Sequence, residues 1–367
     1  MKVFVIGTRG IPGIPGGVEQ HCEQLYPLIA KNNIRVKLSR RSSYVKDKLR
    51  EWKGVELVDI YSPKTKSLEV IIHTSLSIIC AKFWGADIVH IHAIGPAIMT
   101  PLARILRMKV VVTNHGPDYD RQKWGGLAKS ILRLGEYLGC KYANEVIVIS
   151  EHIRGIVQKR CSRDSNLIYN GVPIPELVTS TSYIKSLSLA PQGYIIAVAR
   201  LVPEKGLNDL IDAFEALDSD VKLVIAGDSD HEDSYSKGLK NRAKLNDNIF
   251  MPGYVTGSDL EQLFTHARLF AMPSYHEGLP IALLEALSYG LPVVVSDIPA
   301  NAEVGLASGC YFPVGNVELL THTITSWLKL DINESYKLNI QSWVSRKYNW
   351  DNISNSTISM YQSLNRA

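Results

Sequence analysis

Cysteine is scarce in this sequence of 367 residues, and the pairs that build disulfide or zinc frameworks are missing. The cysteines are odd in number, far apart and never arranged as C-x-x-C (Cys22, Cys80, Cys140, Cys161 and Cys310). Disulfide-rich domains and zinc ribbons both need regularly spaced cysteines. The pattern therefore argues against both classes and favours a reducing cytoplasm.

Long hydrophobic runs are also missing. The longest apolar stretch, 70–85, is interrupted by polar residues, whereas a membrane-spanning helix needs about 20 mostly apolar residues. We expect this stretch to form a buried helix. The amino-terminal run Val3 to Ile6 is too short for the core of a signal peptide and stops at Gly7. We expect a cytoplasmic protein, with peripheral attachment to the inner face of the plasma membrane as a further expectation.

No low-complexity segment is present, and the length exceeds that of one ordinary hydrophobic core, so two domains are expected. Charge divides unevenly between them. Residues 1–183 hold 26 Lys and Arg against 15 Asp and Glu, a net +11, and the remainder holds 14 against 21, a net −7. A basic first half is suited to phosphates, anionic lipid head groups or nucleic acid.

Short β-branched runs alternate with helical patterns in both halves, which is typical of βαβ units and parallel sheets. The predicted strands are 3–6, 36–38, 88–91, 110–113, 146–149, 194–199, 221–226, 249–251, 269–272 and 292–296. The fold class is therefore α/β, with two Rossmann-like doubly wound sheets facing across a cleft. A Pro, Gly, Ser and Thr-rich linker at 171–193 separates an amino-terminal domain, 1–172, from a carboxyl-terminal domain, 173–349.

A glycine-rich stretch, 7–17, follows the first predicted strand and opens a helix. Glycines let the backbone approach an anion, and the amides at a helix start favour phosphate. The dinucleotide pattern G-x-G-x-x-G is absent, since the glycines fall three apart and end in the pair Gly16-Gly17. A turn without a ligand remains the alternative for this segment.

Arg200 and Lys205 follow a predicted strand in the second half, just before a helix. Two cations at the carboxyl end of a strand suit a diphosphate, whose charge they neutralise as it leaves. The alternative is a solvated salt bridge with Glu204.

Two carboxylates, Glu277 and Glu285, flank the start of another predicted helix. Pro280 suits a first helical turn, so the amides of Gly278 and Leu279 are expected to be free for a ligand. The glutamates could accept hydroxyls from two sugars, one of them a ribose. A solvated helix face is the alternative, but apolar residues surround Glu285.

Taken together, these segments resemble the retaining glycosyltransferases of family 4, which have the GT-B fold. The resemblance rests on Gly16-Gly17, Asn114-His115-Gly116, Ser150-Glu151, Asn170-Gly171-Val172, Arg200 with Lys205, and 277–285 with the following 290–294. It covers nearly the whole chain. The stretches 7–12 and 118–125 look like the rhamnosyltransferase subgroup of bacterial polysaccharide assembly.

This resemblance implies a role for each candidate residue. The amides of Gly16 and Gly17 and the side chains of Arg200 and Lys205 would bind the donor diphosphate. Glu277 would bind the transferred sugar, Glu285 the ribose, and Gly278 and Leu279 the donor. His115 would line the reaction centre, and Tyr254 and Val255 would flank the base. The tail, about 350–367, would cross back onto the first domain.

The resemblance also implies a retaining reaction in which a phosphate oxygen of the donor takes the acceptor proton. The substrate is then a nucleoside-diphosphate sugar, dTDP-rhamnose or a UDP-hexose, and no cofactor is required. We expect no essential metal, although D-x-D tripeptides occur at 118–120, 218–220 and 228–230. Of the other histidines, His73, His90, His92 and His266 are expected to be structural.

The segment 121–142 mixes basic and apolar residues, so it could rest on an anionic membrane or simply pack as a surface helix. The expected acceptor is a lipid-linked glycan, and the expected process is the synthesis of O-antigen, capsule or another surface polysaccharide. Two rival functions remain. One is a nucleotide-sugar epimerase, which the joint occurrence of Arg200, Lys205 and the two glutamates disfavours. The other is a nucleic-acid-binding protein, for which no recognised motif is present.

Overall fold

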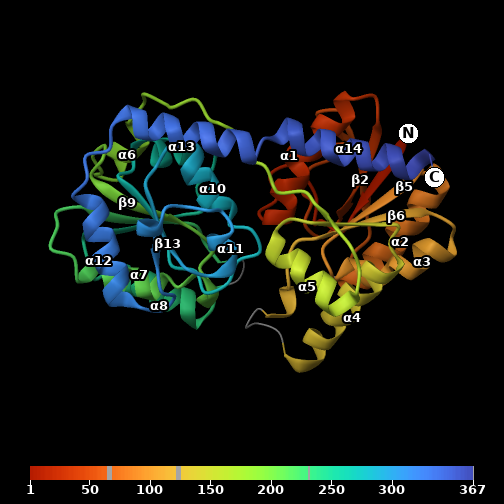
Figure 1. Ribbon diagram of the computed structural model, residues 1–367, viewed down its shortest axis with the longest axis horizontal. Helices are drawn as coiled ribbons and strands as arrows, with labels where there is room; N and C mark the ends of the chain where they lie inside the picture. Colours follow the sequence, from red (N-terminus) through yellow and green to blue (C-terminus); the bar gives the residue numbers. More distant parts are fainter. Residues whose placement is uncertain (64–67, 121–124, 230–231, 367) are drawn as a thin grey trace. The chain divides into compact units, whose positions relative to one another are not determined.

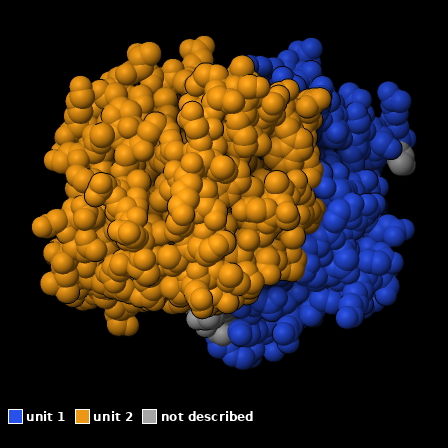
Figure 2. Space-filling model, turned by 60° about the vertical axis from the view of Figure 1, so that its left-hand side comes forward, with its two compact units in different colours: residues 1–171, 348–367 blue, residues 172–347 orange. Residues whose placement is uncertain are grey.

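The computed structural model (Figure 1) describes residues 1–63, 68–120, 125–229 and 232–366. The chain divides into two compact units, which Figure 2 colours separately. Unit 1 comprises Met1–Gly171 with Tyr348–Ala367, and unit 2 comprises Val172–Lys347. In the part of the chain that the structure describes, no helix combines the length and apolar character needed to cross a bilayer.

Unit 1 is built on an eight-stranded sheet in the order β3-β4-β2-β1-β5-β6-β7-β8. Its strands are β1 (Lys2–Ile6), β2 (Arg35–Arg41), β3 (Glu51–Trp52), β4 (Val55–Ile60), β5 (Ile88–His92), β6 (Lys109–Asn114), β7 (Glu145–Val148) and β8 (Asn166–Leu167). All neighbours are parallel except β3, which is antiparallel to β4. The chain order reverses between β1 and β5, and ligands of such sheets bind beyond the carboxyl ends at this point.

Helices cover both faces of this sheet. They are α1 (Gly17–Lys31), α2 (Glu69–Trp84), α3 (Thr100–Ile105), α4 (Gly126–Tyr142), α5 (Glu151–Cys161) and α14 (Trp350–Arg366), with short 3₁₀ turns η1 (Pro96–Met99) and η2 (Asp118–Asp120). The last helix, α14, returns to unit 1 and packs against α1 (Figure 1). Side chains alternate along β1: Val3 and Val5 join the core under α1 and α14, while Phe4 stacks edge-on against Trp84 of α2.

Unit 2 has a six-stranded sheet in the order β11-β10-β9-β12-β13-β14, parallel throughout. Its strands are β9 (Tyr194–Val198), β10 (Lys222–Ala226), β11 (Ile249–Gly253), β12 (Leu269–Met272), β13 (Val293–Ser296) and β14 (Tyr311–Phe312). Its helices are α6 (Ser182–Ser186), α7 (Leu207–Glu215), α8 (Ser234–Ala243), α9 (Gly257–His266), α10 (Ile281–Ser288), α11 (Pro299–Ala302), α12 (Val317–Leu328) and α13 (Glu334–Lys347), with 3₁₀ turns η3 (Pro203–Lys205) and η4 (Ser308–Cys310). Here the order reverses between β9 and β12.

The predicted fold class is confirmed: both units are Rossmann-like α/β domains with doubly wound sheets. Each predicted strand coincides with an observed one to within a few residues. The segment 171–193, predicted as a linker, lacks regular structure up to 181 and then forms α6.

The prediction of a buried helix at 70–85 needs correction. The helix exists as α2, but only one side of it meets the sheet. On the other side Leu76, Ile79 and Phe83 are 39%, 43% and 88% exposed. An all-round apolar helix can bury only the face that its sheet covers, so α2 leaves an apolar stripe at the surface.

Candidate functional site

In unit 1 the carboxyl ends of three neighbouring strands bring together a glycine turn and two histidines. Gly7 follows β1, His92 ends β5, and His115 follows β6. Gly7 adopts φ +108°, and a Cβ there would lie 2.2 Å from the carbonyl oxygen of His92. The glycine is therefore needed for the β1 turn to pass close to the end of β5.

His115 is held in place through its neighbour Asn114. The Asn114 amide nitrogen donates to Glu136 Oε1 at 3.1 Å, and its oxygen accepts from the Gly116 amide at 2.9 Å. Glu136 lies on α4, is 1% exposed, and also accepts from Arg160 Nε at 2.8 Å. Sequence reasoning missed Glu136, which anchors the turn that carries His115.

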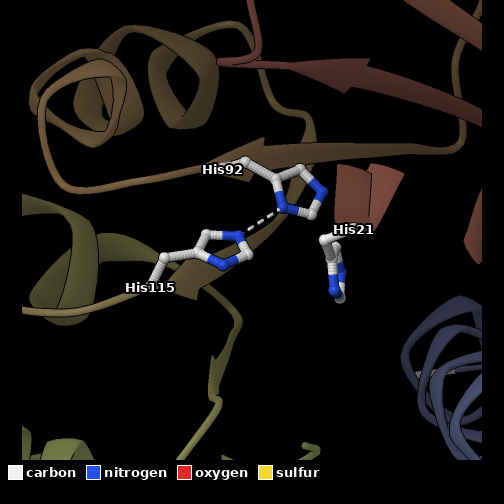
Figure 3. A group of neighbouring side chains, drawn as sticks. All are labelled: His21, His92 and His115. Atoms are coloured by element: carbon white, nitrogen blue, oxygen red, sulfur yellow. Dashed lines mark hydrogen bonds between the residues drawn. The ribbon is translucent and has the colours of Figure 1, made fainter. Parts of the chain in front are cut away.

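His115 belongs to a group of three histidines, with His21 from α1 and His92 from β5 (Figure 3). His92 Nδ1 and His115 Nε2 are 2.9 Å apart, and the two rings stack at 5.2 Å. The His21 ring meets that of His115 edge-on at 5.1 Å. Behind them His92 Nε2 contacts the hydroxyl of Tyr26 at 2.5 Å. His92 thus has both ring nitrogens occupied.

Burial keeps these imidazoles neutral. Loss of solvent, chiefly, lowers the pKa of His21 to about 4, with a weaker opposing effect from a hydrogen bond to Asn170. Desolvation, followed by neighbouring imidazoles, lowers the pKa of His92 and of His115 well below the usual value. At neutral pH each ring therefore carries one proton and offers one donor and one acceptor.

The glycine turn before α1 is lined by a carboxylate. Glu19 Oε1 accepts from the amide of Arg9 at 2.9 Å and from its Nε at 3.3 Å. Gly16 caps α1 with φ +146°, and a Cβ on it would lie 2.0 Å from Glu19 Oε2. An anion bound at the amides of Gly16 and Gly17 would therefore adjoin Glu19 as well as Arg9. Glu19 therefore opposes an anion at these amides while Arg9 favours one, and a turn without a ligand stays the alternative for this segment.

In unit 2 the structure brings Lys205 and Glu277 together. Lys205 Nζ lies 2.6 Å from Glu277 Oε1, and the two side chains are 19% and 10% exposed. Ser274 Oγ donates to the same oxygen at 2.7 Å. Lys205 is thus paired with Glu277 rather than with Glu204, the partner considered from sequence. Among the described residues no hydrogen bond reaches Glu277 Oε2.

Close passage of two loops allows this pairing. Lys205 follows β9 and Glu277 follows β12, and these strands are neighbours in the sheet. Gly206 adopts φ +63°, and a Cβ there would lie 2.2 Å from the carbonyl oxygen of Pro273. The Tyr275 amide also donates to the carbonyl of Glu204 at 2.9 Å. A glycine after Lys205 therefore lets its loop reach the one that carries Glu277.

A chain of buried polar side chains supports Glu277 from behind. Asn301 Nδ2 donates to the Ser296 carbonyl at 2.9 Å, and Ser296 Oγ donates to the Ser274 carbonyl at 2.5 Å. All three residues are fully buried. Sequence reasoning missed them, although Ser274, three residues before Glu277, has the spacing of a local side-chain cap.

The other candidate residues of unit 2 lie around this pair or at the same edge of the sheet. Arg200 and Tyr254 follow β9 and β11, Tyr254 being 60% exposed and Val255 9% exposed. Glu285 is half-buried in the second turn of α10. The expected helix start needs correction, because α10 begins at Ile281 with Pro280 as its cap. Pro280, expected in the first turn, directly precedes it, and Gly278 and Leu279 lie in the loop that leads to the helix.

One group in the described part of the chain has three side chains close enough to share a metal ion, namely His21, His92 and His115. A metal there would have to take a His92 nitrogen from Tyr26 or from His115. Of the D-x-D segments, 118–120 forms η2, Asp228 pairs with Lys240, and Asp230 lies outside the described residues.

Comparison with known proteins finds two family models that match the chain. Residues 15–175 match the model of "Glycosyltransferase Family 4", and residues 182–341 match that of "Glycosyl transferases group 1". An uncharacterized glycosyltransferase of Methanocaldococcus jannaschii is 25% identical over 99% of this chain and 98% of its own length. The O-antigen chain mannosyltransferase B of Escherichia coli is 28% identical over 49% of each chain.

Solved structures share the fold. Anabaena HepE, solved in complex with UDP-glucose, superposes with a TM-score of 0.80 at 20% identity, over 99% of both chains. Sucrose-phosphate synthase of Thermosynechococcus elongatus superposes with a TM-score of 0.84 at 18% identity, over 99% of this chain and 98% of the other. From the two family matches and the fold, the chain belongs to the GT-B glycosyltransferases of group 1 and family 4.

Proposed function

We propose that this glycosyltransferase moves a hexose or rhamnose from a UDP- or dTDP-sugar to a lipid-linked glycan acceptor. The reaction would serve the synthesis of O-antigen or another surface polysaccharide. The Lys205–Glu277 pair carries the proposal. Lys205 has three N–H donors and gives one to Glu277, which leaves two for phosphate oxygens. Glu277 keeps Oε2 for a sugar hydroxyl.

The remaining candidate residues complete this donor site. Arg200 adds a second cation at the end of β9, and Gly278 and Leu279 follow Glu277 in the same loop. Glu285 binds the ribose, and Tyr254 and Val255 flank the base. Gly16 and Gly17 supply amides from the glycine turn. HepE was solved with UDP-glucose, and the relatives include an O-antigen mannosyltransferase, which support a nucleotide-sugar donor and a glycan acceptor.

His115 lies at the reaction centre in this proposal, and the donor's own phosphate takes the acceptor proton. The reaction therefore retains anomeric configuration and needs neither a protein nucleophile nor a metal. The two relatives described above are glycosyltransferases and give the epimerase alternative no support. Anomeric analysis of the product by NMR tests retention, and an unchanged rate in the presence of a chelator is the expected result for a metal-independent transfer.

A peripheral position on the membrane is also proposed. The basic and apolar segment 121–142 forms α4 from Gly126 onward, while Arg121–Trp124 lie outside the described residues. Leu127 and Leu134 are 79% and 48% exposed on α4, a helix that also carries the basic residues Lys129 and Arg133. A helix with both apolar and basic residues suits an anionic lipid surface.

The donor site is tested with Lys205→Met and a panel of nucleotide sugars. Thermal shifts across the panel identify the best donor. Calorimetry then measures the Kd of the nucleoside diphosphate that corresponds to this donor. Loss of a charge-assisted bond of about 1.5 to 3 kcal/mol should raise the Kd about 10- to 150-fold. Lys237→Met, at a lysine 62% exposed on α8, is the matched control and should bind normally. Equal affinities for both variants would contradict the proposed site.

A further inference from the structure

Five buried side chains form a continuous hydrogen-bonded chain that ends at His115. Thr113 Oγ1 lies 2.7 Å from His90 Nε2, and His90 Nδ1 lies 2.5 Å from the hydroxyl of Tyr361 and 2.9 Å from that of Tyr26. The Tyr26 hydroxyl then contacts His92 at 2.5 Å, and His92 contacts His115 at 2.9 Å. The group joins β5, β6, α1 and the returning helix α14.

The lengths of these contacts favour one arrangement of the donors. A neutral imidazole has one bare nitrogen with one in-plane lone pair, and it accepts one hydrogen bond well. O–H donors reach shorter distances than N–H donors, whose usual distance is about 2.9 to 3.0 Å. The contact of 2.5 Å between Tyr361 and His90 Nδ1 therefore fits a Tyr361 hydroxyl donating to a bare Nδ1. His90 then carries its proton on Nε2 and donates to Thr113.

The same reasoning favours one acceptor for the proton of Tyr26. The proton of Tyr26 has three possible acceptors: His90, Tyr361 and His92. His90 Nδ1 already accepts from Tyr361, and the contact of 2.5 Å with His92 Nε2 has the length of an O–H donor. Burial raises the pKa of Tyr26 and of Tyr361, so both hydroxyls stay protonated. Tyr26 therefore donates to His92 Nε2.

His92 must then hold its proton on Nδ1, where it donates to His115 Nε2. His115 is left with its proton on Nδ1, an atom with no hydrogen-bond partner among the described residues. Tyr26 and His92 are 0% exposed, so neither reaches a substrate. Their effect on catalysis would pass through His115, which is half-buried.

We propose that Tyr26 and His92 are positioning residues that hold the proton of His115 on Nδ1, so that His115 offers a substrate oxygen a hydrogen-bond donor and cannot act as a base through this nitrogen. Tyr361 gives the returning helix α14 a part in this arrangement. The effect on turnover rests on the proposed function, whereas the position of the proton does not. A donor at this point would stabilise charge on a sugar or phosphate oxygen.

The proton is located by NMR on the full chain labelled with ¹⁵N-histidine, since a protonated and a bare ring nitrogen differ widely in chemical shift. His115→Gln assigns the His115 signals. The wild type should show protonated Nδ1 and bare Nε2 at His115, and the reverse would overturn the proposal without any variant of Tyr26. In Tyr26→Phe, His92 loses its donor, so the His115 signals should shift towards a mixture of both forms. An unchanged His115 spectrum would also overturn it.

Turnover is the second measurement. Tyr26→Phe should lower kcat about 10- to 100-fold, the range for an outer partner that orients a functional histidine, with the KM for the donor unchanged. The matched control is Tyr194→Phe, which removes a buried hydroxyl bonded to the Leu263 carbonyl at 2.7 Å in unit 2. It should leave kcat and the His115 spectrum unchanged. A wild type that transfers no sugar would refute the proposed function, while the NMR result would still decide the position of the proton.

Discussion

Glu277 concentrates its contacts on one carboxylate oxygen and leaves the other for a ligand. Lys205 and Ser274 both donate to Oε1, and Ser274 is itself fixed by Ser296. A side chain held in this way has lost most of its rotational freedom before a sugar arrives. Because transfer depends on holding two reactants in a narrow geometry, a fixed acceptor for a hydroxyl should act mainly on the rate.

Replacing Glu277 with Gln tests this expectation. The amide keeps the size of the side chain but removes the charge that pairs with Lys205 and weakens the acceptor. We expect kcat/KM to fall about 100-fold, comparable with other losses of a preorganised polar group at a reacting centre. Steady-state kinetics with the best donor provide the measurement. Glu334→Gln, at a side chain 75% exposed on α13, is the control, and similar rates for both variants would rule out a catalytic role for Glu277.

At the scale of helices and strands, the sequence predicts regular patterns well and long-range partners poorly. Runs of β-branched residues predict the buried strands because both faces of a parallel sheet are covered. Strand β4 was not predicted, because Glu56 and Asp59 interrupt its apolar pattern. Lys205 and Glu277 could be expected to lie close together, because each follows a predicted strand and the two strands are neighbours in the sheet. Tyr26 and Tyr361 are 335 residues apart and lie on two packed helices, and no periodicity indicates their contact.

The exposed apolar residues of α2 and α4 raise the question of membrane attachment at the same scale. Leu127, Ile131 and Leu134 are spaced four and three residues apart, so they share one side of α4. The stripe with Phe83 lies on α2, and both helices pack against η1. Transfer of these exposed apolar side chains into a lipid interface lowers the free energy, and cations on the same helix add attraction to anionic head groups.

Flotation with liposomes measures this attachment. The wild type should float with vesicles that contain anionic lipid, and less so at high salt, because screening weakens the attraction of the cations. Replacing Leu127 and Leu134 together with Ser should reduce the floating fraction strongly. Leu245→Ser, at a residue 89% exposed in unit 2, is the control. Wild-type protein that stays in the pellet fraction under low salt would argue against attachment.

On the scale of the whole molecule, the buried histidines of unit 1 predict how this unit responds to acid. Five of its histidines have a lowered pKa: His21, His73, His90, His92 and His115. Burial is the largest cause in each, and it lowers the pKa of His73 to about 4 and that of His90 to about 3. The cluster that orients His115 is therefore also the acid-sensitive part of the fold.

Proton binding determines whether unit 1 gains or loses stability as the pH falls. Above pH 6.5 these histidines are neutral whether unit 1 is folded or unfolded. Below pH 6.5 the unfolded chain takes up protons that the folded unit excludes, so stability is lost as the pH falls towards the folded pKa values. At pH 5.5 each histidine costs about 1.4 kcal/mol, and five together cost about 7 kcal/mol, which is comparable with the whole stability of a domain.

Hydrogen exchange at pH 7.5 and 5.5, corrected for the intrinsic rates, should therefore show a large loss of protection in unit 1. Peptides from β5 and β6 report on unit 1, and peptides from β9 and β10 report on unit 2, which should change little. His73→Leu removes one excluded proton from a fully buried site outside the His115 cluster and should restore about 1.4 kcal/mol to unit 1 at pH 5.5. Equal losses in both units, or no benefit from His73→Leu, would show that acid acts through groups other than the buried histidines.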